Sequence, residues 1–128
     1  MQVRGIDFVG IAVGDLDAAR HFYGEVLGLP ALGTFGDSWA EFDAGNVTLS
    51  LIKADPAAIA KRLEAGPYAS IGVAIAVPDV GAAIDELRQR GIKVVMETTE
   101  GSPCFTAMVE DPSGNFVWLH HRKDGTAG

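Results

Sequence analysis

Among the side chains of this 128-residue sequence whose types can catalyse reactions, His120 is the first candidate to consider. An imidazole nitrogen can accept a proton or anchor a polar group, so His120 is a candidate general base or polar anchor, with the carboxylate of Glu41 as its partner. The alternative interpretation is a histidine on an edge strand that faces water. These two residues therefore form a weak acid–base hypothesis and do not by themselves define a catalytic centre.

A metal site is the second chemistry to consider, because His120, Glu41 and Cys104 together would supply imidazole, carboxylate and thiolate ligands. They lie on separate predicted strands, and no spacing in the sequence brings them together. Cys104 is the only cysteine, and we interpret it as a small buried apolar residue and not as a nucleophile. His121 points away from His120 by strand alternation, and His21 lies on a predicted helix near solvent. We predict no metal ligands in this chain.

An internal repeat predicts the elements that position these side chains. Residues 8–19 read FVGIAVGDLDAA and residues 72–83 read GVAIAVPDVGAA, so that seven of twelve positions are identical at an offset of 64 residues. Each copy predicts a strand followed by a helix, and Asp15 and Asp79 are placed to cap the helix N-termini. Agreement in both the strand and the helix start indicates a duplicated unit.

The first strand of each copy has two different faces. Branched residues alternate with residues that are mostly small, so one face suits packing under a helix and the other leaves room for a cavity. We expect the two helices to end near Gly28 and at Gly91. Three strands are expected after each helix, at residues 31–35, 39–43 and 47–53 in the first copy and at 92–99, 104–110 and 116–122 in the second.

These elements predict an α+β protein with one domain over residues 1–122. It consists of module one (1–53), a connector helix (54–69) that Asp55-Pro56 opens and Gly66-Pro67 closes, and module two (70–122). Residues 111–115 read Asp-Pro-Ser-Gly-Asn, which is a strong turn signal. The polar, glycine-rich tail at 123–128 is predicted to be flexible.

The net charge of −7 argues against nucleic acid as a partner, because a phosphate backbone would be repelled. The same acidity slightly favours cationic or neutral ligands. No apolar run is long enough for a membrane span, and the N-terminus has no signal-peptide pattern. One cysteine needs no oxidising compartment, so we expect a cytoplasmic protein.

Two phrases carry a resemblance to a known superfamily. IDFVGIAVGDLDAARHFYGEVLGLP at residues 6–30 resembles the opening of a vicinal oxygen chelate domain, and VEDPSGNFVWLHHRK at residues 109–123 resembles its closing hairpin. This superfamily includes glyoxalase I, bleomycin-resistance proteins, methylmalonyl-CoA epimerase and extradiol dioxygenases. The resemblance implies two tandem βαβββ modules that form a cupped mixed sheet, and it implies a homodimer by analogy.

Metal-dependent members take two ligands from each module, one from its first strand and one from its last. The resemblance carries these positions to Phe8 and Gly72 on the first strands, to Trp118 on the last strand of module two, and to the neighbourhood of Ser50 in module one. Phenylalanine and glycine offer no donor atom, and the indole N–H only donates. The resemblance therefore implies a cup without the usual metal ligands and without a cofactor.

Phe8 and Trp118 would both project into this cup. They are interpreted either as aromatic walls for a flat or apolar ligand or as side chains that fill the space of a lost metal site. Ser50 and His120 are expected hydrogen-bonding points. Trp39 and Phe105 are further candidates for the cavity wall, although strand alternation alone does not decide which face they occupy.

The leading hypothesis is a metal-independent small-molecule binding protein resembling bleomycin-resistance proteins, which points to antibiotic resistance or to carriage of a natural product. The alternative is a divergent glyoxalase-type lyase, epimerase or dioxygenase with a rebuilt metal site or acid–base catalysis. A third hypothesis is an interaction module that keeps the fold alone.

Overall fold

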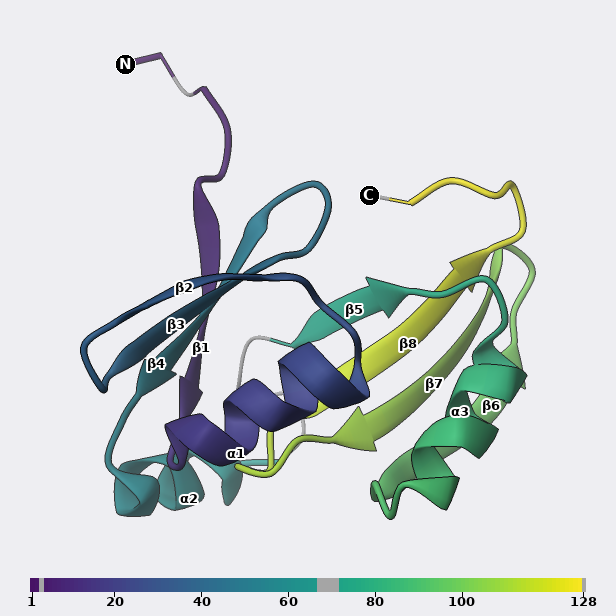
Figure 1. Ribbon diagram of the computed structural model, residues 1–128. Helices are drawn as coiled ribbons and strands as arrows, with labels where there is room; N and C mark the ends of the chain where they lie inside the picture. The colour runs from purple at the N-terminus through teal and green to yellow at the C-terminus, as the bar shows by residue number, and fades with distance from the viewer. Residues whose placement is uncertain (3, 67–71, 128) are drawn as a thin grey trace. The chain divides into compact units, whose positions relative to one another are not determined.

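The computed structural model describes residues 1–2, 4–66 and 72–127, and these residues form two compact units, unit 1 (Met1–Ala60) and unit 2 (Lys61–Gly128). Each unit contains a four-stranded mixed sheet with the same strand connectivity (Figure 1). The predicted α+β fold with two tandem βαβββ modules is confirmed. No described helix is long and apolar enough to cross a membrane.

Unit 1 has the strand order β1-β4-β3-β2, with β1 parallel to β4 and the other pairs antiparallel. Its strands agree with the predicted ranges to within one residue. The elements are β1 (Phe8–Val13), α1 (Leu16–Arg20), η1 (His21–Val26), β2 (Ala31–Phe35), β3 (Trp39–Asp43) and β4 (Thr48–Lys53).

The helix after β1 begins as predicted and changes its type midway. The Asp15 carboxylate accepts a hydrogen bond from the Ala18 N–H at 3.0 Å, which caps α1. The chain then continues as the π-helix η1, in which the Leu27 N–H donates to the Phe22 carbonyl five residues earlier at 2.8 Å. Gly28 ends this segment with φ +78°, in the region that favours glycine.

The core of unit 1 lies between its sheet and this helical segment. Each of the strands β1, β3 and β4 has one buried face, in agreement with the two-residue alternation of side chains along a strand. The opposite face is more exposed on β1 and β3. The buried apolar side chains of the core are Ile11, Val13, Leu16, Ala19, Phe22, Tyr23, Ala40, Phe42, Leu49 and Leu51.

The helix expected as a connector, α2 (Pro56–Leu63), contains the boundary between the two units. Asp55 opens it, since its carboxylate accepts from the Ala57 N–H at 2.9 Å. The expected end at Gly66-Pro67 lies partly outside the described residues, as do residues 67–69 of the predicted connector and residues 70–71 of module two.

Unit 2 repeats the arrangement, with the strand order β5-β8-β7-β6 and with β5 parallel to β8. Alternate residues of β7 and β8 pack with the buried face of helix α3, where Val80, Ile84 and Leu87 lie. The elements are β5 (Val73–Ala76), α3 (Val80–Gln89), β6 (Val94–Glu100), β7 (Cys104–Glu110) and β8 (Phe116–Arg122).

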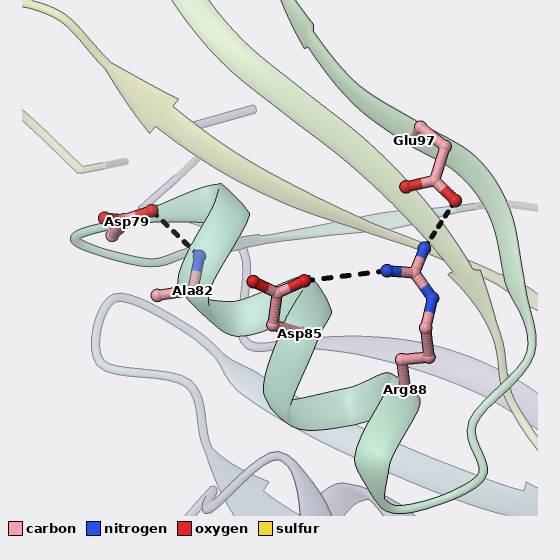
Figure 2. A network of polar contacts seen from close by, with 5 residues as sticks. All are labelled: Asp79, Ala82, Asp85, Arg88 and Glu97. Carbon is pink, nitrogen blue, oxygen red and sulfur yellow. Dashed lines mark hydrogen bonds and ion pairs between the residues drawn. The ribbon is translucent and has the colours of Figure 1, made fainter.

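Helix α3 has well-defined ends and a polar link to β6. The Asp79 carboxylate accepts from the Ala82 N–H at 2.9 Å, and Arg88 bonds both Asp85 and Glu97 (Figure 2). Because these ion pairs are exposed to solvent, they contribute little to the free energy of unfolding. At the C-terminus, Gly91 has φ +76°, and the N–H groups of residues 91 and 92 bond the carbonyls of residues 88 and 87, which is a Schellman motif.

The predicted turn at residues 111–115 is confirmed and is held by buried polar side chains. The Asp111 carboxylate accepts from the backbone N–H groups of Ser113 and Asn115, both at 2.8 Å, and from the Asn115 side-chain amide at 3.0 Å. The Asn115 amide oxygen in turn accepts from Arg62 at 3.1 Å. This network joins the β7–β8 turn to the end of α2.

Candidate functional site

The more exposed face of the unit 1 sheet carries an ordered grid of side chains around Ser50. Residues paired across β3, β4 and β1 project to the same side of the sheet, so the pairing register defines three rows. Ser50 occupies the centre, with Glu41 and Gly10 beside it. In the order β3, β4, β1, the rows are Asp43–Thr48–Phe8, Glu41–Ser50–Gly10 and Trp39–Ile52–Ala12.

Phe8 and Trp39 stand at diagonally opposite corners of this grid, and their rings are nevertheless in contact. The two positions are separated by about 10 Å across two strand spacings and by about 13 Å along four residues. The ring centroids lie only 5.6 Å apart, with an angle of 76° between the planes. Both rings must therefore lean over the middle row, where Ser50 and Gly10 lie.

Gly10 makes this close approach feasible. A Cβ atom at this position would lie 2.9 Å from Ile52 Cδ1 and 3.8 Å from Phe8 Cε2. The space that a side chain would fill is thus occupied by its two neighbours on the same face. At Gly10, the space predicted beside the small residues of β1 is therefore filled by Ile52 and Phe8.

Ser50 is fully buried, and its hydroxyl has no hydrogen-bond partner among the described residues. Burial of an unsatisfied hydroxyl costs about 1–3 kcal/mol. The aromatic pair and Ile52 lie on the same face around it. An orphaned polar group at the centre of an aromatic surface is a point where a ligand can supply the missing hydrogen bond.

Glu41 is the charged neighbour of Ser50. Its Oε1 atom accepts a hydrogen bond from Trp39 Nε1 at 3.0 Å, and the side chains of both residues are partly buried. Within residues 4–66 and 72–127, no lysine, arginine or histidine forms an ion pair with Glu41. The indole therefore fixes a carboxylate beside the orphaned hydroxyl.

The corresponding face of unit 2 has its aromatic ring at another position of the repeat. Ala74 pairs with Trp118 as Gly10 pairs with Ser50, so Trp118 and Ser50 are equivalent. The ring of Trp118 lies over Gly72, since a Cβ atom there would be 3.4 Å from the indole Nε1. Of the first and last strands, unit 1 carries its ring on the first, at Phe8, and unit 2 carries its ring on the last, at Trp118.

His120 shares the face of Trp118, next to Thr106 and Ala76, and is half-buried. The expected pairing of His120 with Glu41 has no support within either unit, because the two residues belong to different units. His121 lies on the opposite face, as alternation predicts, with its Nδ1 atom 3.1 Å from the Val77 carbonyl oxygen.

The side chain of Phe105, a predicted wall residue whose facing strand alternation left open, lies on the other face of the unit 2 sheet. It pairs with His121 across the sheet, the two rings lie 6.4 Å apart, and Lys123 Nζ is 5.0 Å from the Phe105 ring centroid. Phe105 is therefore on the face opposite to Trp118, and it does not line the same surface. The sequence pattern of β7 left this choice open because both of its faces carry apolar residues.

The four residues that the resemblance predicts at metal-ligand positions do not fit a divalent ion. Phe8, Gly72 and Trp118 provide no lone pair, and the hydroxyl of Ser50 is a poor ligand by itself. Elsewhere in the described part of the chain, no group of three or more His, Cys, Asp and Glu side chains is arranged to hold a metal. Cys104 is half-buried and belongs to no such group.

Two hollows of about 430 and 440 Å³ lie on unit 1, away from the grid. They follow the helical segment α1–η1 and share Asp17 and Arg20, which form an ion pair at 3.8 Å. Sequence reasoning missed both, because charged residues on a helix resemble an ordinary solvated face. The first is lined by Asp17, Arg20, His21, Gly24, Glu25, Leu29, Ala31 and Phe42.

Comparison with solved structures supports this fold. UcmS2 is 29% identical over 94% of this chain and 98% of its own, with a TM-score of 0.74. TnmS3, an antibiotic binding protein from Streptomyces sp. CB03234, is 23% identical over 96% and 99%, with a TM-score of 0.76. A lactoylglutathione lyase from Agrobacterium tumefaciens is 21% identical over 94% and 95%, with a TM-score of 0.69. The last two likenesses establish the fold alone.

A comparison with curated protein sequences gave no significant match. The family model described as Glyoxalase/Bleomycin resistance protein/Dioxygenase superfamily matches residues 5–119, which is most of the chain and spans both βαβββ modules. With that match and the two module folds in agreement, the chain belongs to the Glyoxalase/Bleomycin resistance protein/Dioxygenase superfamily.

Proposed function

We propose that this protein binds a flat, apolar or aromatic small molecule without the help of a metal ion. The ligand lies on the grid face of unit 1, where it contacts Phe8 and Trp39 and gives the Ser50 hydroxyl its missing hydrogen bond. The orphaned hydroxyl beneath an aromatic pair is the observation that carries the proposal. Binding then removes the free-energy cost of the unpartnered, buried Ser50 hydroxyl.

The contact between Phe8 and Trp39 can be replaced by contacts of each ring with an aromatic ligand. Phe8 is 47% exposed and lies at the start of β1, so its ring can move without opening the core. Edge-to-face or stacked contacts contribute about 0.5–1.5 kcal/mol each beyond burial of apolar area. A flat ligand that replaces the contact between Phe8 and Trp39 keeps such interactions with both rings and gains access to Ser50.

The superfamily supports this function without specifying it. One structural neighbour, TnmS3, is described as an antibiotic binding protein, and another is described as a lyase. The donor set at the family ligand positions favours the binding role, because those residues do not hold an ion. Trp118 and His120 remain predicted ligand contacts from unit 2, and the homodimer and the cytoplasmic location remain predictions.

The proposal is tested with 9-anthracenemethanol, a flat neutral molecule with one hydroxyl, whose fluorescence anisotropy reports binding. Ser50→Ala and Phe8→Ala should each weaken its affinity about fivefold to tenfold, which corresponds to loss of one hydrogen bond or one ring contact. Phe105→Ala is the matched control, since it removes a ring from a face that the ligand does not contact. No binding to the unaltered protein, or equal loss in all three variants, contradicts the proposal.

A further inference from the structure

We infer that the ligand of this face carries a protonated amine, which Glu41 and Ser50 receive together. This inference rests on the proposed function and names the class of molecule that the same site selects. It follows from the middle row of the grid, where a carboxylate and an unpartnered buried hydroxyl are direct neighbours across β3 and β4.

Glu41 and Ser50 are placed to act on one group. Side chains directly opposite each other on an antiparallel pair have Cβ atoms about 4.5–5.5 Å apart. An ammonium group has three N–H donors, and both a carboxylate and a serine oxygen accept hydrogen bonds. One ammonium can therefore donate to the buried Ser50 oxygen and to the Glu41 carboxylate at the same time. A neutral hydroxyl can bond both groups as well, but it lacks the positive charge that complements the carboxylate.

The carboxylate is held in position before any ligand arrives. Trp39 Nε1 donates to Glu41 Oε1 at 3.0 Å, so the second oxygen, Oε2, keeps its full capacity to accept a hydrogen bond from a ligand. The described residues supply no cationic side chain to neutralise Glu41. A partly buried carboxylate without a counterion is best satisfied by a cation from outside the chain.

The surrounding rings favour the same kind of ligand. Phe8 and Trp39 flank the middle row, and aromatic faces attract an ammonium through their quadrupole. Phe35 pairs with Trp39 across β2 and β3 and is 63% exposed, so it extends the aromatic surface on which a flat skeleton can lie. The net charge of −7 adds a long-range attraction for cations.

The test compares two molecules of nearly equal shape, 9-(aminomethyl)anthracene, which is protonated at neutral pH, and 9-anthracenemethanol, which is neutral. We expect the unaltered protein to bind the amine about tenfold more tightly than the alcohol, as one charge-assisted hydrogen bond predicts. Glu41→Gln, which keeps an acceptor for Trp39, should bring the two affinities to within twofold. The preference should also shrink as salt is added to the unaltered protein.

Asp17→Asn is the control for net charge, because it removes one negative charge from an exposed residue of α1 away from the grid. It should keep the preference for the amine. Equal affinity for both molecules, or a preference that survives Glu41→Gln, overturns the inference and leaves the proposed function standing. Failure of both molecules to bind overturns the proposed function itself.

Discussion

The indole N–H of Trp39 donates a hydrogen bond to the carboxylate of Glu41, two residues further along β3, at 3.0 Å. Residues at this spacing project to the same face of a strand. The ring that contacts Phe8 is thus the ring that orients the carboxylate paired with Ser50 across β3 and β4. Apolar contact and polar recognition depend on one side chain, so replacement of Trp39 should disturb both.

Ser50→Ala should stabilise the ligand-free protein while it weakens binding. The hydroxyl is buried without a partner, and its removal should raise the free energy of unfolding by about 1 kcal/mol, measured by urea denaturation. Ser102→Ala, at an exposed position, is the control and should change stability by less than about 0.5 kcal/mol. A loss of stability in Ser50→Ala would show that the hydroxyl has a partner in the folded protein.

Asn115→Ala should destabilise the protein by about 2–3 kcal/mol, since it removes the side-chain amide that donates to Asp111 Oδ2 and accepts from Arg62. Chemical denaturation measures this change. Asp124→Ala is a suitable comparison, because its carboxylate also accepts a backbone N–H, that of Thr126, at 2.9 Å but in an exposed turn. A change of equal size in both variants would contradict the structural role of the buried network.

Gly91→Ala should lower the free energy of unfolding by about 1 kcal/mol, because its φ of +76° is costly for a residue with a Cβ atom. Thermal unfolding would show a lower melting temperature. Gly101→Ala provides the control, since a Cβ atom there would meet its nearest neighbours at an ordinary 3.7 Å and φ is not positive. Equal effects of the two substitutions would exclude backbone strain as the cause.

Protein purified without chelators should contain far less than one divalent ion per chain, and a chelator should leave anthracene binding unchanged. The physical reason is the donor set, in which three of the four family positions have no lone pair to offer. Elemental analysis by mass spectrometry measures the metal content. A stoichiometric ion that survives dialysis would instead favour the enzymatic alternative.

Much of the fold was predictable because the repeat indicates where a strand and a helix begin in each module. Residues that cap the helices then indicate where those helices begin and end. Asp15, Asp79 and Gly91 each act through their own backbone neighbourhood, and their roles are confirmed. The π-helix η1 was not predicted. The apolar stripe of this segment fits an α-helix equally well, and the wider turn appears only in the bond from Leu27 to Phe22.

The site was less predictable because its key contacts join strands that are distant in the sequence. The contact between Phe8 and Trp39 depends on the pairing register of β1, β4 and β3. Whether the Ser50 hydroxyl has a hydrogen-bond partner depends on the side chains that pack around it in the folded protein. Neither follows from the spacing of residues. Phe105 shows the same limit, since alternation defines two faces of β7 and only the pairing with β8 tells which one holds the ring.

The two modules carry their aromatic rings at different repeat positions. The first-strand position has a ring at Phe8 in module one and none at Gly72 in module two. The last-strand position has none at Ser50 in module one and a ring at Trp118 in module two. Two copies of one ancestral segment have changed at different positions and toward different sizes. A metal site at these four positions would therefore require new side chains in both modules, because Phe8, Gly72 and Trp118 provide no lone pair.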